Sequence, residues 1–250
     1  MEHDETTKPS NIMKKNTVLF LCATLVSTLA CGDNSGDINT NDNSSENKGS
    51  VEAVDLGLSV KWASCNVGAE SEWEIGDYFA WGEVQPKASY LANNYKHRDA
   101  NGNWIKYAFH DDALVDADVA KADNQATLLP EDDAATAILG DGWRMPSPEE
   151  AQELMDKCEI RYWEQGIQLV GPNGNSICIP YGGSKQGEKV RGEKTTSYWT
   201  NQLYSQKGTN FLGGEELVYV EQYGRRFDVK AKTVGMEYRY NGLPIRAVKK

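Results

Sequence analysis

The sequence predicts an α+β fold in which two short helices pack on short, mostly antiparallel strands. The helical pattern is confined to residues 132–139 and 147–158, whereas the rest of the folded region reads as short strand-like runs broken by Gly, Asn and Pro. Residues 51–250 have the length of one large domain, and no internal repeat or second linker interrupts them. We therefore expect a single α+β domain over residues 51–250.

The N-terminal region has the pattern of an export signal. Residues 13–31 read MKKNTVLFLCATLVSTLAC, so that Lys14 and Lys15 precede an apolar run that ends in small residues. This run is too short for a stable membrane-spanning helix, because the hydrocarbon core is ~30 Å thick. Met13 is the more natural initiator for such a signal, unless the signal is recessed behind the polar residues 1–12.

Cys31 resembles the lipobox cysteine of bacterial lipoproteins, which becomes the first residue after cleavage and carries lipid. Thr28 departs from that pattern, since those motifs usually have Leu there. The resemblance implies that residues 1–30 are an N-terminal extension and lipoprotein signal peptide, with lipidation at Cys31. The alternative is an ordinary signal peptide with a nearby cysteine.

Residues 31–50 have the composition of a flexible tether. Beyond Cys31 they contain one apolar residue, Ile38, and cannot bury enough surface to offset the entropy of ordering. A coil of this length has a root-mean-square reach of ~25 Å. Asp33 and Asp37 resemble the acidic signal that sends lipoproteins of Bacteroides-like bacteria to the outer surface. The sequence thus predicts a cell-envelope, outer-membrane lipoprotein with a surface-exposed domain.

The charge balance argues against nucleic acid as a partner. The formal net charge is −11, and removal of residues 1–30 leaves it unchanged, since this segment contains three residues of each sign. Nucleic acids and anionic lipids are held by clusters of Lys and Arg, which this chain lacks. We expect contact with the membrane through the lipid anchor only.

The elements of the domain are predicted from local signals. Residues 51–62 read as one or two strands, residues 78–83 as an aromatic-rich strand, and Asn101-Gly102 as a tight turn. Residues 132–139 form a short helix with acids in its first turn, ended by Gly140. Further strands are expected at 167–170, 176–180, 197–200, 217–223, 227–232 and 244–249.

The segment 147–158 is the clearest helix. Ser147 is expected to cap it, Pro148 suits the first helical position, and Glu150 completes a capping box. One face of the helix is apolar and consists of Ala151, Leu154, Met155 and Cys158.

Six segments, taken together, resemble a known family. They are VDLGLSVKWASCNVGA (54–69), GDYFAWGE (76–83), EDDAATAILGDGWRMPSPEEAQEL (131–154), GPNGNSICIPYGG (171–183), SYWT (197–200) and GLPIRAV (242–248). In this order they are similar to Bacteroidetes surface lipoproteins related to the Fibrobacter succinogenes major paralogous domain. The resemblance implies a C-type-lectin-like fold, akin to the formylglycine-generating enzymes, in which the terminal strands pair and place 244–249 near 52–60.

Four residues around the second helix are expected to be structural. The segment Trp143-Arg144-Met145-Pro146-Ser147 is similar to the family motif that opens this helix. Trp143 and Trp199 are expected in the core between helix and sheet. Arg144 could pair with Glu149, with Asp141 or with a backbone carbonyl.

The cysteines of the domain are Cys65, Cys158 and Cys178. An exported protein permits disulfides, and the family pattern favours a bridge between Cys65 and Cys158. The alternative is three buried thiols that behave as small hydrophobic groups. Formylglycine-generating enzymes hold copper with a cysteine pair near the C-terminus. No cysteine follows Cys178, so that activity is not carried over.

Motifs for catalysis and metal binding are absent from the sequence, which contains no HExxH, GxSxG, P-loop or CxxC pattern. His110-Asp111-Asp112 could bind a metal, but a solvated polar loop is the favoured interpretation. Asp99 to Asn103 has alternating oxygen ligands, yet a hairpin turn is the simpler interpretation. The calcium-dependent sugar motifs of C-type lectins are also missing. We predict no cofactor, no metal and no catalytic residue.

The remaining signal is a set of aromatic residues in polar, loop-like contexts, which suit recognition of a sugar or protein. The candidates for ligand binding are Trp73, Trp104, Tyr181 and Tyr204; others of this kind are Tyr90, Tyr95, Tyr107 and Tyr223. The sequence therefore predicts a non-catalytic surface protein that binds a glycan or protein ligand in adhesion. The alternatives are a structural subunit or tip component of a surface appendage, and an enzyme on the formylglycine-generating scaffold.

Overall fold

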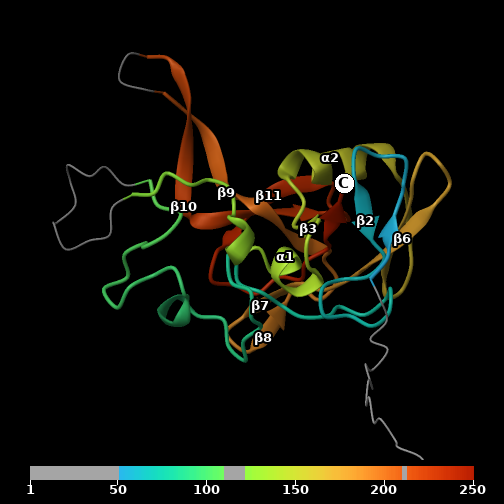
Figure 1. Cartoon of the computed structure of the whole chain (residues 1–250), viewed down its shortest axis with the longest axis horizontal. Coiled ribbons are helices and arrows are strands. Elements are labelled where there is room, and N and C mark those ends of the chain that lie inside the picture. The colour runs from blue at the N-terminus through green and yellow to red at the C-terminus, as the bar shows by residue number, and fades with distance from the viewer. Residues whose placement is uncertain (1–50, 110–121, 210–212) are drawn as a thin grey trace, which may run out of the picture. The chain divides into compact units, whose positions relative to one another are not determined.

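A computed structural model describes residues 51–109, 122–209 and 213–250. Within these residues the chain contains two α-helices, two short 3-10 helices and four small antiparallel sheets, which confirms the predicted α+β class (Figure 1). The expected signal segment, Cys31, the tether and His110-Asp111-Asp112 lie outside the described residues. No helix in the described ranges is long and apolar enough to cross a membrane.

The two ends of the domain meet in a four-stranded sheet with the order β1-β2-β12-β3. Its strands are β1 (Ala53–Val54), β2 (Lys61–Ala63), β12 (Val248–Lys249) and β3 (Trp143–Arg144). Val248 lies opposite both Trp62 and Arg144, and the Ala63 N–H donates to the Ala247 carbonyl over 2.9 Å. Pairing of the terminal strands is confirmed, although residues 61–63 rather than 52–60 contact β12.

The other sheets are built from segments close in sequence. Strands β4 (Glu159–Tyr162), β5 (Gly166–Val170) and β6 (Ser176–Pro180) form a meander, and β7 (Ser184–Gln186) pairs with β8 (Lys189–Arg191). A third sheet has the order β11-β10-β9, from β9 (Ser197–Thr209), β10 (Glu215–Asp228) and β11 (Thr233–Tyr238).

The strand predictions for β9 and β10 were too short. Residues 197–200 are only the beginning of β9. Residues 217–223 and 227–228 belong to one strand, β10, which ends at Asp228, so that residues 229–232 of the last predicted strand are not part of it. Gly224 lies within this strand, at a point where the pairing with β9 shifts register, and a side chain there would collide with the buried rings of Trp81 and Trp199. The outer ends of β9 and β10 project from the fold as a two-stranded arm (Figure 1).

The segment 78–83 is not a regular strand, contrary to the prediction. It makes a single bridge between Phe79 and Leu243, and the Trp81 N–H donates to the Arg239 carbonyl over 2.8 Å. Its extended backbone is therefore held by tertiary contacts rather than by a strand ladder. The segment delivers the ring of Trp81 into the core, where it is fully buried.

Helix α2 (Pro148–Lys157) is built as predicted. The Glu150 N–H donates to the Ser147 hydroxyl over 3.2 Å, and the Ser147 N–H donates to the Glu150 carboxylate over 2.8 Å. The carboxylate of Glu150, not that of Glu149 or Asp141, pairs with Arg144 at 2.5 Å; Arg144 also donates to the Met145 carbonyl. Trp143 and Trp199 are buried, as expected.

The first helix begins later than predicted. Residues 130–132 form a 3-10 turn, η2 (Pro130–Asp132), and helix α1 spans Ala134–Leu139. Asp133 ends the turn and caps α1, because its carboxylate accepts from the N–H groups of Ala135 and Thr136. Asp132 is therefore not a solvated first-turn acid; it is buried beneath the turn.

The core consists of two apolar clusters. One lies between α2 and the sheets and includes Trp62, Leu154 and Phe227; the rings of Trp62 and Phe227 meet edge to face at 6.1 Å. The other surrounds Trp81 and Trp199. All described residues belong to one compact unit.

Candidate binding site

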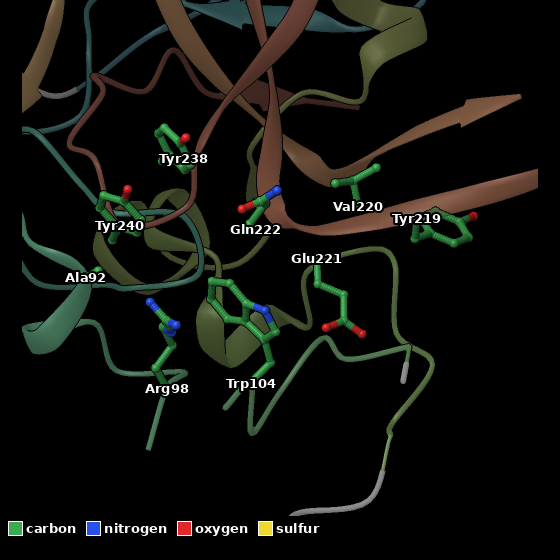
Figure 2. Close-up of a pocket in the computed structure, with 9 residues that line it drawn as sticks. All are labelled: Ala92, Arg98, Trp104, Tyr219, Val220, Glu221, Gln222, Tyr238 and Tyr240. Carbon is green, nitrogen blue, oxygen red and sulfur yellow. The ribbon is translucent and has the colours of Figure 1, made fainter. Parts of the chain in front are cut away.

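A cavity of about 640 Å³ opens between the segment 92–104 and the strands β10 and β11 (Figure 2). Four of its lining side chains are aromatic, and most of the others carry a charged or amide group. The lining residues are Ala92, Arg98, Trp104, Tyr219, Val220, Glu221, Gln222, Tyr238 and Tyr240. The site thus combines flat apolar faces with hydrogen-bonding groups, as binding pockets for small polar ligands do.

The turn that carries Trp104 is fixed by Asp99. The Asp99 carboxylate accepts from the N–H groups of Asn101 and Asn103 at 2.9 and 2.8 Å, and Arg98 bridges to Trp104 across the turn. The predicted hairpin turn at Asn101-Gly102 is confirmed. Hydrogen bonds from Asn103 lower the pKa of Asp99, so its oxygens are already engaged in holding the turn.

Two guanidinium groups lie against the indole of Trp104. The guanidinium carbons of Arg98 and Arg239 are 4.7 and 4.6 Å from the ring centroid. Tyr95 contacts the same ring edge to face at 6.0 Å. Since cations favour the face of an indole, Trp104 is positioned by its neighbours, and in Figure 2 its ring nitrogen lies on the side toward Glu221.

Arg239 lies buried against this indole. It is fully buried, and its guanidinium donates to the Tyr95 hydroxyl and to three backbone carbonyls, at Lys106, Tyr107 and Glu221, over 2.9 to 3.1 Å. No carboxylate of the described residues lies within ion-pair distance of it. The hydrogen-bond partners of this buried guanidinium, which lies against the ring of Trp104, are therefore dipoles rather than carboxylates.

Three tyrosines complete the lining of the cavity, with Tyr238 and Tyr240 at one end and Tyr219 at the other (Figure 2). The rings of Tyr238 and Tyr240 stack with centroids 5.1 Å apart and an angle of 18°, and Tyr223 packs on Tyr238 at 4.8 Å. Tyr219 stacks on Phe109 at 4.4 Å. The ring of Tyr238 remains 38% exposed, so the stacked pair offers an accessible aromatic surface beside the polar groups.

The polar groups of β10 face the cavity with spare hydrogen-bonding capacity. The N–H of Phe109 donates to one carboxylate oxygen of Glu221, which orients this side chain. The side chain of Gln222 is exposed and makes no hydrogen bond to the described residues. Carboxylate, amide and guanidinium groups are thus all available to a ligand at one site.

Behind the cavity lies a buried ionic cluster around Asp132. Although burial opposes it, hydrogen bonds from Lys106, Lys96 and Tyr107 lower the pKa of Asp132 to about 2. His97 lies 3.9 Å from Asp132 and contacts the Gly82 carbonyl at 2.8 Å. Burial lowers the pKa of His97 to about 4, so this ring is neutral near pH 7 and belongs to the packing of the loops.

The structure does not bring the four predicted ligand-binding aromatics together. Trp104 lines the cavity, whereas Trp73 lines a different cavity with Trp163. Tyr181 packs against the core beside Lys230. Tyr204, which belongs to β9, lies beside Arg225. Three further aromatics that the sequence placed in loops are interior residues, namely Tyr90, Tyr95 and Tyr107.

Sequence reasoning missed most of the cavity. Tyr238 and Tyr240 flank the buried Arg239. This alternation has the period of an extended segment with one solvent-exposed face. That pattern could have indicated an exposed aromatic pair. Tyr219 and Arg98 had no comparable local signal.

The expected bridge between Cys65 and Cys158 is not formed. The structure has Cys65, Cys158 and Cys178 as free, buried thiols. Burial raises the pKa of Cys158 to about 11. In the described part of the chain, no group of three His, Cys, Asp or Glu side chains is placed to hold a metal ion.

Comparisons with protein-family models, with curated proteins and with solved structures find no match to this chain. The class of molecule is thus defined by its own features, an α+β domain of small antiparallel sheets with an aromatic-lined polar cavity.

Proposed function

We propose that this chain is a lipid-anchored cell-surface protein that binds a glycan in the cavity between segment 92–104 and strands β10 and β11, without turning it over. One observation carries the proposal: four aromatic side chains and three planar polar ones line a single cavity of about 640 Å³. A protein ligand remains within the same class of function, but a concave site of this size suits a few sugar rings better than a flat protein surface.

A sugar ring matches the chemistry of the cavity. A pyranose has C–H faces that pack on aromatic rings and a rim of hydroxyl groups that donate and accept hydrogen bonds. The stacked pair Tyr238 and Tyr240 offers the aromatic surface, while Glu221, Gln222 and Arg98 offer acceptors and donors. The indole N–H of Trp104 adds a further donor beside Glu221 (Figure 2).

The fold and location are part of the same proposal. We assign a C-type-lectin-like fold, as in the Bacteroidetes surface lipoproteins related to the Fibrobacter succinogenes major paralogous domain. The pairing of β12 with β2 and the capped helix after Trp143-Arg144 support this assignment. The lipobox-like Cys31 supports anchoring at the outer membrane, and Cys31→Ser is expected to release the protein from membranes that have been washed with salt.

Glycan-array binding of the fluorescently labelled Cys31→Ser chain tests the function, followed by calorimetric titration of each glycan that binds. Tyr238→Ala and Gln222→Ala are expected to weaken binding at least about tenfold, which corresponds to ~1.4 kcal/mol. Tyr204→Ala is the matched control, because this half-buried tyrosine of β9 does not line the cavity. Binding should survive EDTA.

Two outcomes would contradict the proposal. If Tyr204→Ala weakens binding as much as Tyr238→Ala, the cavity is not the site. If the ligand is consumed on prolonged incubation, the protein is an enzyme, and the formylglycine-generating scaffold becomes the first hypothesis.

The second candidate function is that of a structural subunit or tip component of a surface appendage. It is favoured by the projecting arm, in which residues 205–209 of β9 and 215–219 of β10 pair only with each other among the described residues (Figure 1). Leu217 on this arm is 61% exposed. Such edges can add a strand from another copy of the chain. Concentration-dependent assembly that Leu217→Lys abolishes would favour this function.

A further inference from the structure

A second cavity, of about 350 Å³, lies in a different part of the fold, between the loop at residues 70–76 and the sheet β4-β5-β6. Two tryptophans and a carboxylate are among its lining side chains. The lining residues are Glu72, Trp73, Trp163, Gln165, Gln168 and Cys178. None of them belongs to the proposed glycan site, so the two sites can be tested independently.

Both tryptophans are attached to fixed backbone. Trp163 lies in the tight connection between β4 and β5, where its N–H donates to the Gly166 carbonyl over 2.9 Å. Residue 166 must be glycine, because a Cβ there would collide with the Ile179 carbonyl. The loop before Trp73 is closed by Glu74, whose carboxylate accepts from the Glu70 N–H over 2.8 Å. The cavity is thus largely preformed.

The two indoles form an open pair. Their ring centroids are 6.4 Å apart and their planes make an angle of 58°, so the rings are not stacked on each other. Trp163 is 54% exposed, a high value for so large an apolar side chain, and Trp73 is half-buried. A cation acts on an indole within ~6 Å of its centroid. Since the centroids are only 6.4 Å apart, one cation can lie within reach of both rings.

The charge around this pair is negative. Glu72 lines the cavity, and Glu70 and Glu74 lie beside it on the same loop. None of the three makes an ion pair with a Lys or Arg side chain in the described part of the chain, and no basic residue lines the cavity. The thiol of Cys178 also lines the cavity, and burial together with the Glu72 carboxylate raises its pKa to about 12. The carboxylate of Glu72 therefore has no ion-pair partner among the described Lys and Arg side chains, although it interacts electrostatically with the buried guanidinium of Arg246, which donates to the Cys178 carbonyl.

We propose that the Trp73–Trp163 cavity binds a small molecule that carries a quaternary ammonium group. A trimethylammonium group is weakly hydrated and apolar on its surface, so that it can pack against both indoles at a smaller desolvation cost than a primary ammonium ion. Its charge interacts with both rings and with the Glu72 carboxylate. Gln165 and Gln168 remain to bind a hydroxyl or carbonyl group elsewhere in the ligand.

The test compares choline with 3,3-dimethyl-1-butanol, which replaces the nitrogen by carbon and has the same shape without the charge. Both are titrated by calorimetry and tryptophan fluorescence into the purified full-length chain that carries Cys31→Ser. Choline is expected to bind saturably and the alcohol at least about tenfold more weakly. Equal affinity of the two compounds, or no saturation by choline, would overturn the proposal.

Three variants locate the binding. Trp163→Ala is expected to abolish saturable choline binding, and Glu72→Gln is expected to weaken it several-fold while leaving the weak binding of the alcohol unchanged. Tyr162→Ala is the matched control, since this neighbouring tyrosine is 61% exposed and does not line the cavity. Thermal melting verifies that each variant is folded. Unchanged choline affinity in folded Trp163→Ala would place the binding elsewhere and contradict the assignment.

Discussion

At the scale of single residues, the site depends on buried polar groups that hold the loops in place. The guanidinium of Arg239 joins three segments that are distant in sequence, at Tyr95, at residues 106–107 and at Glu221. His97 and Asp132 lie close to each other in the same region, and their buried side chains help to hold the loops in place. Because these groups are buried, changes in their protonation act on the stability of the fold.

The pH dependence of stability is expected to report on His97. Its pKa is about 4 in the folded protein and 6.5 in an unfolded chain. The unfolded chain therefore binds more protons between these values, and the free energy of unfolding falls as the pH decreases through this window, by on the order of 3 kcal/mol. Urea denaturation between pH 7 and pH 4 measures this loss.

His97→Gln provides the comparison, since its amide can still donate to the Gly82 carbonyl but does not titrate. The variant is expected to be much less sensitive to pH over the same window. An identical pH dependence in both proteins would show that other groups are responsible.

The three cysteines of the domain are expected to be inert thiols in the folded protein. Burial raises the pKa of Cys158 to about 11, and burial together with Glu72 raises that of Cys178 to about 12. Little thiolate of Cys158 or Cys178 is therefore present at pH 8. A soluble protein that begins at Glu46 should react slowly with a thiol reagent when native and release three equivalents in guanidinium without reductant. Release of only one equivalent would indicate that Cys65 and Cys158 form a disulfide bond in the protein.

At the scale of elements, those with complete local signals could be predicted from the sequence. Helix α2 has its cap, its first-turn proline and its apolar face within residues 147–158, and all of them hold in the structure. Segment 78–83 and strand β10 could not be predicted correctly, because their conformations depend on contacts with Arg239, Trp81 and Trp199 that come from elsewhere in the chain.

The cap of α2 can be measured directly. Ser147→Ala removes the acceptor of the Glu150 N–H and is expected to lower the free energy of unfolding by ~0.5–2 kcal/mol. Trp143→Ala removes a buried ring and leaves a cavity, so it should lower the free energy of unfolding by more, ~3–5 kcal/mol. Urea denaturation at pH 7 measures both. The reverse order of the two losses would mean that Trp143 is not a core residue.

At the scale of the whole molecule, the candidate site is formed where three segments of the chain meet. Its lining comes from residues 92–104, 219–222 and 238–240, which are far apart in the chain. The sequence identified aromatic residues in polar contexts, and of its four candidates only Trp104 reached this cavity. Which aromatic rings meet is decided by the pairing of β10 with β11 and by the position of Arg239, neither of which has a local signature.

The fold also places two separate aromatic sites on one domain. Trp104 belongs to a cavity lined by one guanidinium group and one carboxylate, at Arg98 and Glu221, whereas Glu72 is the charged residue that lines the cavity of Trp73 and Trp163. This difference in local charge predicts ligands of different chemistry. A surface protein with two such sites could hold two ligands at once without competition between them.

The most direct test of the account is an indole NMR experiment on the Cys31→Ser chain with a glycan that binds on the array. Each tryptophan gives one indole N–H signal, assigned by substitution. The account predicts that the Trp104 signal shifts saturably with the glycan, while those of Trp73 and Trp163 stay in place. Shifts at Trp73 and Trp163 with an unchanged Trp104 signal would contradict the glycan site between segment 92–104 and strands β10 and β11.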